Sequence, residues 1–171
     1  MPNFDNVISL IQNSQQTLLV LCGLPYAGKS YVAKHLLGKS NLEFVSIDDI
    51  FRERGFDWNT NKLPSAEEWQ QIFDESYQKT KVALGQGKNV LYDSTNHTVA
   101  SRHKLQEIAS SVGGQSKVLY VKSAVGTIWK RWEENQKNPT RTIVGRELVQ
   151  STIDYFEEPT ENENLITIDN S

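Results

Sequence analysis

The sequence is poor in cysteine, in long apolar runs and in basic charge, and each scarcity excludes a class of protein. Cys22 is the only cysteine among 171 residues, so no intrachain disulfide can form and a disulfide-stapled domain is excluded. It lies in an apolar run, where a buried, inert thiol is expected. No apolar run reaches the ~18 residues that a membrane-spanning helix requires. Residues 1–5 lack the basic and apolar segments of a secretory signal, so the expected compartment is the cytoplasm.

The chain also lacks a surplus of positive charge. Its 18 lysine and arginine residues are outnumbered by 21 aspartate and glutamate residues, which gives a net charge of −3. A dedicated nucleic-acid-binding protein usually carries a clear basic excess, so this balance argues against such a partner. A small basic groove on an acidic protein remains compatible with the count. The three histidines show no metal-ligand spacing with cysteine or glutamate.

What is present is a regular alternation of apolar runs and helical patterns. Strands are expected at 17–22, 43–47, 89–92, 117–121 and 165–168. Segments with apolar residues at helical spacing lie between them, and one begins at Ser65-Ala66-Glu67-Glu68, which has the form of a capping box. Strands that alternate with helices favour a single α/β domain over residues 1–171, with a parallel sheet covered on both faces. Two segments without apolar periodicity, 55–64 and 134–145, are expected to be mobile.

A glycine-rich motif between the first strand and the next helix carries the strongest signal. It matches G-x-x-x-x-G-K-[S/T] and consists of Gly23, Leu24, Pro25, Tyr26, Ala27, Gly28, Lys29 and Ser30. In such a loop, backbone N–H groups turn inward around phosphate oxygens, and the helix N-terminus adds its positive dipole. We therefore expect Lys29 to reach the β- and γ-phosphates of ATP and Ser30 to hold Mg²⁺. Position 32, which is Val32, is assigned to the same nucleotide site, and Tyr26 is expected to be exposed.

Acidic residues follow the second and third expected strands. Because ligands bind beyond the carboxyl ends of parallel strands, Asp48, Asp49 and Asp93 are expected at the same rim as Lys29. Asp93 follows an apolar strand in the manner of a Walker B residue, which predicts a role at the metal. Asp48 is the predicted general base for an attacking hydroxyl. The alternative for Asp48 or Asp49 is the N-cap of a helix over 50–54.

Together these residues resemble the polynucleotide-kinase-like and zeta-toxin-like branch of P-loop kinases. The resemblance rests on Gly23–Ser30, on the Asp48-Asp49 pair, on residues 86–96 with their final Asp-Ser-Thr-Asn, and on Arg102. It extends over nearly the whole chain from Thr17. It implies a three-layer, adenylate-kinase-like P-loop NTPase fold, whose five-stranded parallel sheet has the order 2-3-1-4-5.

The resemblance also implies residue roles. A basic lid over ATP is expected at about residues 131–146, with Arg141 as its catalytic cation and Arg131 stacked on adenine. The catalytic aspartate of the branch falls on Asp48. The residues with expected substrate contacts are Asp49, Arg52, Thr95, Asn96 and Arg102. Ile47 and Phe51 stand where the phage-type polynucleotide kinase has basic residues, which argues against a nucleic-acid substrate.

These inferences predict an ATP:hydroxyl phosphotransferase that uses Mg²⁺ and acts on a small molecule. The alternatives are a 5′-hydroxyl polynucleotide kinase and a nucleotide-binding regulator without an acceptor site. Asp48 distinguishes a kinase from a regulator, because only a kinase needs a carboxylate beside its acceptor. The sequence leaves the acceptor, the choice of ATP or GTP, and the oligomeric state open.

Overall fold

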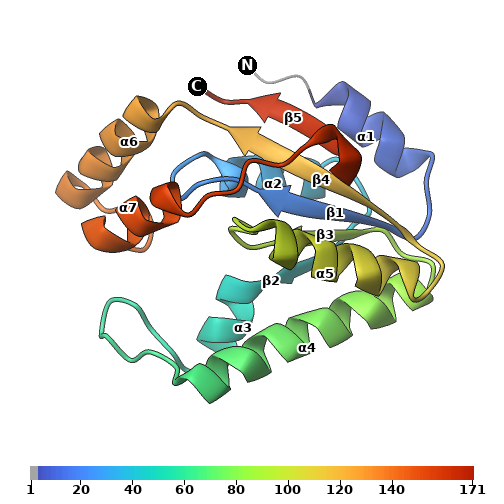
Figure 1. Cartoon of the computed structure of the whole chain (residues 1–171), viewed down its shortest axis with the longest axis horizontal. Helices are drawn as coiled ribbons and strands as arrows, with labels where there is room; N and C mark the ends of the chain where they lie inside the picture. Colours follow the sequence, from blue (N-terminus) through green and yellow to red (C-terminus); the bar gives the residue numbers. More distant parts are fainter. Residues whose placement is uncertain (1–3) are drawn as a thin grey trace.

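The computed structural model describes residues 4–171, which form an α/β fold of three layers (Figure 1). Its five parallel strands have the order β2-β3-β1-β4-β5. The strands are β1 (Thr17–Cys22), β2 (Glu43–Ser46), β3 (Val90–Asp93), β4 (Gln115–Lys122) and β5 (Leu165–Asp169). The predicted fold class and sheet order are confirmed, and each predicted strand is present within two residues of its expected ends.

Helices connect the strands and cover both faces of the sheet. They are α1 (Asp5–Gln12), α2 (Lys29–Leu37), α3 (Ile47–Glu53), α4 (Ala66–Gly85), α5 (Val99–Ser110), α6 (Val125–Lys137) and α7 (Arg146–Asp154), and the 3₁₀ helix η1 (Glu161–Glu163) precedes β5. The predicted capping box starts α4, since Ser65 Oγ accepts the Glu68 N–H at 3.2 Å and Glu68 accepts the Ser65 N–H at 2.8 Å. Within the described part of the chain, no helix has both the length and the apolar character that crossing a bilayer requires.

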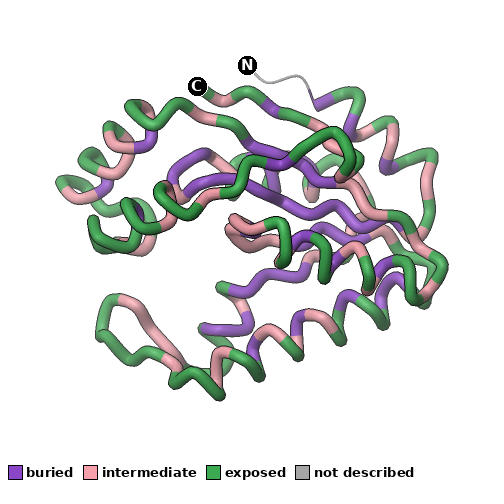
Figure 2. Tube along the Cα trace, viewed as in Figure 1, coloured by how far each residue is buried: buried purple, intermediate pink, exposed green. Residues whose placement is uncertain are grey.

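The central strand β1 is buried along its whole length, and it separates two hydrophobic cores. Because side chains alternate along a strand, Leu19 and Leu21 pack with residues of α1, α2, α6 and α7, whereas Leu18 and Val20 pack with α3, α4 and α5. Figure 2 shows the buried trace concentrated in the strands and on the inward sides of the helices. A strand with two buried faces explains the continuous apolar run of the sequence.

Part of one segment without apolar periodicity is helical. Residues 134–137 belong to α6, although the sequence shows no apolar periodicity there. Asn135 supplies the reason, because its side chain is buried and accepts hydrogen bonds from the N–H groups of Thr140 at 3.0 Å and Arg141 at 3.3 Å. The end of α6 is therefore stabilised by a polar group that a search for apolar spacing does not detect.

A buried ion pair holds the region behind the end of β1. The Arg102 side chain of α5 is only 1% exposed and donates to both carboxylate oxygens of Glu163 in η1, at 2.5 and 3.2 Å. Arg102 also donates to the Asn96 carbonyl at 3.0 Å. Asn96 in turn donates from its amide to the Leu21 carbonyl at 2.6 Å. The network fixes the segment after β3 against the strand that leads into the glycine-rich loop.

Replacing Arg102 with methionine is expected to lower the free energy of unfolding by about 3 kcal/mol, because Glu163 then loses its partner in a largely buried site. Urea denaturation measures the loss. Arg54→Met is the matched control, since Arg54 is 32% exposed and pairs with Glu75 at 2.8 Å near the surface. Its loss should stay below about 1 kcal/mol. Equal losses in the two variants would contradict the role given to Arg102.

Candidate active site

The carboxyl ends of three neighbouring strands bring the predicted residues together. In the sheet register, Asp93 of β3 pairs with Ser46 of β2 on one side and with Leu21 of β1 on the other. Asp48 lies two residues beyond Ser46 and Gly23 two residues beyond Leu21. The first turn of α3 and the glycine-rich loop therefore flank Asp93, as the rule for parallel sheets predicts.

The carbonyl groups of the glycine-rich loop are occupied by side-chain donors. Lys29 Nζ donates to the carbonyls of Gly23 and Leu24, at 2.8 and 3.0 Å. Arg131 donates to those of Tyr26 and Ala27, at 3.1 and 3.3 Å. A carbonyl oxygen repels phosphate, so tying these groups to donors leaves the N–H groups of the loop to face an anion.

Two glycines of the loop are required by its backbone and by its neighbours. Gly23 has φ +151°, and an added Cβ would lie 2.6 Å from the Val121 carbonyl. Gly28 has φ +103°, and an added Cβ would lie 2.1 Å from Nδ2 of Asn170. Any larger residue at either position would displace β4 or the segment after β5.

Asn170 is a site residue that the sequence did not reveal. Its side-chain amide donates to the Ala27 carbonyl at 2.7 Å, and its own carbonyl accepts from Arg131 at 3.0 Å. The available signal was its position just beyond the carboxyl end of a parallel strand. Arg131 thus braces the loop together with Asn170, while its predicted stacking on adenine stays a prediction.

A cavity of about 640 Å³ lies beside the loop, which is a size suited to a small ligand. Gly28 and Ser30 line it from the loop, and Arg131, Arg141 and Asn170 line it from the C-terminal half of the chain. A smaller depression of about 370 Å³ on the surface of α7 contains none of the predicted site residues. The larger cavity is therefore the candidate nucleotide site.

Position 32 does not belong to this cavity. Val32 is fully buried and packs in the core between α2 and the sheet, so its assignment to the nucleotide site is wrong. The neighbouring Tyr31 is half exposed and lines the cavity instead. Tyr26 also differs from expectation, because it is buried rather than exposed.

The charges at the site act strongly on one another. The pKa of Asp93 is raised to about 6, chiefly by burial; Lys29 opposes this rise, Asp48 and Asp49 add to it, and Arg141 opposes it. Burial also lowers the pKa of Lys29, against the opposing effect of Asp93. These mutual effects indicate that all five charged groups share one site.

The two aspartates at the start of α3 have different surroundings. The helix N-cap is Ser46, whose Oγ accepts the Asp49 N–H at 3.3 Å, so the alternative that an aspartate caps the helix is wrong. Asp49 forms an ion pair with Arg52. The Asp48 side chain is exposed and makes no hydrogen bond or ion pair with any other residue of the described range 4–171. Asp48 is therefore the carboxylate available to a substrate.

The other predicted substrate contacts divide into surface and interior residues. Arg52 is exposed, and Thr95 is half-buried with its carbonyl accepting the Gly23 N–H at 3.3 Å. Asn96 and Arg102 are buried and bonded to the protein itself, so their prediction as substrate contacts needs correction. Both side chains hold the loop that precedes α5 in place, and neither faces the cavity.

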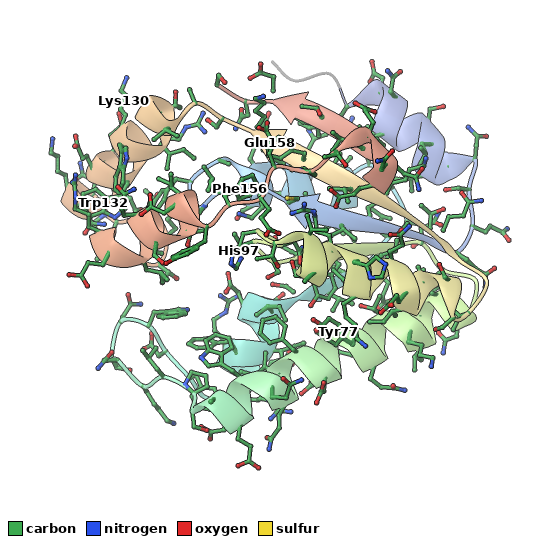
Figure 3. All side chains as sticks on the ribbon, in the orientation of Figure 1. Tyr77, His97, Lys130, Trp132, Phe156 and Glu158 are labelled. Carbon is green, nitrogen blue, oxygen red and sulfur yellow. The ribbon has the colours of Figure 1, made fainter. Side chains whose placement is uncertain are left out.

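The predicted lid is held by a hydrogen bond within it and by contacts of two of its arginines with aromatic rings. Trp132, which lies on α6 in Figure 3, donates from its indole N–H to the Val144 carbonyl at 2.8 Å. The guanidinium of Arg146 lies 4.7 Å from the ring centroid of Trp129. The guanidinium of Arg141 lies 4.3 Å from the ring centroid of Tyr26. Arg141 therefore reaches the glycine-rich loop from the segment between α6 and α7.

The oxygen ligands at the site fit Mg²⁺ that arrives with a nucleotide. Ser30 and Asp93 offer a hydroxyl and a carboxylate, the hard oxygen donors that this ion prefers. Within residues 4–171, no group of three or more histidine, cysteine, aspartate or glutamate side chains is arranged to hold a metal by itself. Two protein ligands completed by phosphate oxygens and water are typical of Mg²⁺ at phosphoryl-transfer sites.

Comparison with known proteins places the site in context. The family model described as "AAA domain" matches residues 18–159. Shikimate kinase of Legionella pneumophila (strain Corby) is 26% identical over 138 residues, which cover 75% of this chain and 71% of that protein.

Solved structures share the fold. A chain of the Pnkp1/Rnl/Hen1 RNA repair complex superposes with a TM-score of 0.71 at 19% identity, over 84% of this chain but only 44% of that one. Kti12 of Chaetomium thermophilum, in complex with ADP-AlF3, has a TM-score of 0.66 at 21% identity, over 90% and 89% of the two chains. These likenesses show a shared fold.

The raised pKa of Asp93 leads to a pH prediction. Mg²⁺ binds the carboxylate and not the carboxylic acid, so the Mg²⁺-dependent affinity for nucleotide should fall as the pH drops below about 6. The fall should approach tenfold per pH unit. ATP titrates in a similar range, so the comparison is with Asp93→Asn under identical conditions, measured by calorimetry. Asp93→Asn should bind more weakly and with a flatter pH profile, and parallel profiles would contradict the assignment.

Proposed function

This chain belongs to the AAA domain family, and from its site we propose that it transfers the γ-phosphate of ATP to a hydroxyl group of a small molecule. The observation that carries the proposal is the arrangement at one edge of the sheet. Asp93 lies between the strand ends that lead to Asp48 and to the loop with Lys29, and Arg141 lines the cavity beside that loop. A nucleotide-binding regulator needs phosphate-sensing loops but has no use for the exposed carboxylate of Asp48.

The nucleotide is bound through the glycine-rich loop. Loop N–H groups and the first turn of α2 surround the β- and γ-phosphates. The Lys29 ammonium has three N–H donors, of which two are bonded to the Gly23 and Leu24 carbonyls, so the third can donate to a phosphate oxygen while the carbonyls stay tied. Ser30 and Asp93 would hold Mg²⁺, which would supply positive charge to the phosphates.

The transfer step is a direct displacement. The hydroxyl oxygen of the acceptor forms a bond to the γ-phosphorus, while the bond from that phosphorus to the β–γ bridging oxygen breaks and leaves ADP with the electron pair. Asp48 orients the hydroxyl and takes its proton, which later passes to water. Arg141 and Lys29 balance the negative charge on the three oxygens of the transferred group.

The surroundings of Asp48 favour a small acceptor. The cations nearest to it along α3 are already paired, Arg52 with Asp49 and Arg54 with Glu75, so they offer little charge to a chain of phosphates. Phe51 is buried and stacks on Trp58, with ring centroids 5.3 Å apart. A position where a basic residue would contact a substrate phosphate is thus part of an aromatic core.

The similar proteins suggest two kinds of acceptor. The likeness to the RNA repair complex favours a 5′-hydroxyl polynucleotide acceptor, whereas the relative named shikimate kinase favours a small one. The net charge of −3 and the paired arginines support the small acceptor. The likeness to Kti12 with ADP-AlF3 supports nucleotide binding in either case.

Asp48→Asn is expected to keep nucleotide affinity and to lose phosphoryl transfer by about 10²–10⁴-fold, because the amide cannot accept the hydroxyl proton. Calorimetry with ATP and an assay of ADP release measure the two effects separately. Asp49→Asn is the comparison variant. If Asp49→Asn is the more damaging change while Asp48→Asn stays active, the base is Asp49.

The class of acceptor is tested by competition between two kinds of substrate. ADP release is measured with a panel of small hydroxyl compounds, including hydroxy acids, sugars and nucleosides, and end labelling is measured with a 5′-hydroxyl oligonucleotide at low salt. We expect turnover with a member of the panel. Efficient, salt-sensitive end labelling that disappears in Asp48→Asn would instead identify a polynucleotide kinase.

A further inference from the structure

The contact between Tyr26 and Arg141 has no part in the function proposed so far. Tyr26 belongs to the glycine-rich loop, and Arg141 belongs to the segment between α6 and α7. We propose that the ring of Tyr26 positions the Arg141 guanidinium at the transferred phosphate, which makes Tyr26 a positioning residue for catalysis. This inference rests on the proposed phosphoryl transfer and adds a residue to it.

Tyr26 is a costly residue at its position. Its φ of +64° lies in the left-handed region, which disfavours every residue with a side chain of this size. Its hydroxyl is buried, and no other atom of residues 4–171 accepts or donates a hydrogen bond to it. A glycine would avoid both disadvantages. The ring is therefore expected to contribute something that a small residue lacks.

The contribution visible in the structure is a platform for a cation. The ring is only 3% exposed, and the Arg141 guanidinium carbon lies 4.3 Å from its centroid. That distance is well within the range of a cation–π interaction. Since Tyr26 is part of the phosphate-binding loop, a cation on its face is held at the phosphates.

The backbone of Arg141 is fixed independently of its side chain. Asn135 accepts the Arg141 N–H at 3.3 Å and donates to the Arg141 carbonyl at 3.3 Å. The torsions of the Arg141 side chain are the freedom that remains, because its backbone is already held. The ring of Tyr26 restricts the rotamers of Arg141. The side chain has therefore already lost its conformational entropy before the transition state forms.

The electrostatics of the site agree with this placement. The charge of Arg141 lowers the pKa of both Lys29 and Asp93, the two groups that flank the phosphates and the metal. A guanidinium pointing into solvent would have little influence on either group. Arg141 therefore stands at the active site in the same conformation in which it contacts Tyr26.

The test compares Tyr26→Leu with Tyr26→Phe. Both variants lose the hydroxyl and keep an apolar side chain at the same backbone position, but only phenylalanine keeps the π face. The probes are ADP alone and ADP with aluminium fluoride, a mimic of the transferred phosphoryl group that needs no identified acceptor. Calorimetry in the presence of Mg²⁺ gives the ratio of the two affinities, which reports on charge stabilisation at the γ position.

Tyr26→Leu is expected to reduce this ratio by about 3–30-fold, the range of a desolvated cation–π contact, whatever its affinity for ADP alone. Tyr26→Phe should restore most of the ratio. Tyr155→Leu, a change in a tyrosine that is 72% exposed, controls for the loss of a tyrosine elsewhere. An unchanged ratio in Tyr26→Leu, or an equal loss in Tyr26→Phe, would overturn the proposal.

A double-mutant cycle shows whether Tyr26 acts through Arg141. Arg141→Ala should lower the ratio at least as much as Tyr26→Leu, and the double variant should lose no more than Arg141→Ala alone. Additive losses would mean that Tyr26 acts by another route. Should Tyr26→Leu fail to fold, Arg141→Lys replaces it, because lysine keeps the charge but stacks poorly, and an unchanged ratio there counts against the proposal. If the wild type binds neither ADP nor the mimic, the proposed function fails instead.

Discussion

The structure depends on holding the backbone of one loop with its N–H groups toward an anion and its carbonyls away from it. A short loop of this kind is unfavourable without support, because each carbonyl needs a donor other than the ligand. Here the donors are the side chains of Lys29, Arg131 and Asn170, which come from three separate parts of the chain. The last residues after β5 are thus as necessary to the phosphate site as the loop itself.

A second layer of support lies behind the loop and uses buried charge. Arg102 and Glu163 hold the segment around Asn96, and Asn96 holds the end of β1. A buried ion pair adds little net stability, but it fixes geometry because any misplacement leaves a charge without a partner. The same low polarity acts on Asp93, where burial raises the pKa to about 6. Positioning and reactivity at this site therefore share one physical origin.

The parts predicted from the sequence are those determined by local pattern. A few neighbouring residues are enough to predict the structure of three segments: the apolar run 17–22, the motif Gly23–Ser30 and the capping box at Ser65. The parts that could not be predicted depend on contacts between distant residues. Asn170 and Ala27 are 143 positions apart, so no spacing in the sequence indicates that they meet.

The errors have the same cause. Asn96 and Arg102 lie beside a motif that binds ligands, and only the tertiary structure shows that the Arg102 guanidinium is paired with Glu163. The two aspartates after Ser46 predict an acidic helix cap, but the cap is Ser46, since a cap stands before the first turn. Val32 faces the core because a helical position two residues beyond Ser30 lies on the opposite side of α2 from the cavity.

The lid combines fixed and adaptable elements in a way that suits phosphoryl transfer. Asn135 and Trp132 hold its backbone by hydrogen bonds, whereas the side chains of Arg141 and Arg146 rest on aromatic rings. A hydrogen bond fixes both distance and direction, but a cation on a ring can slide across the face at small cost. Arg141 can therefore follow the transferred group as it moves from ADP to the acceptor without losing its support. A lid fixed only by hydrogen bonds would bind one position of the phosphoryl group, whereas catalysis requires the strongest binding at the position between donor and acceptor.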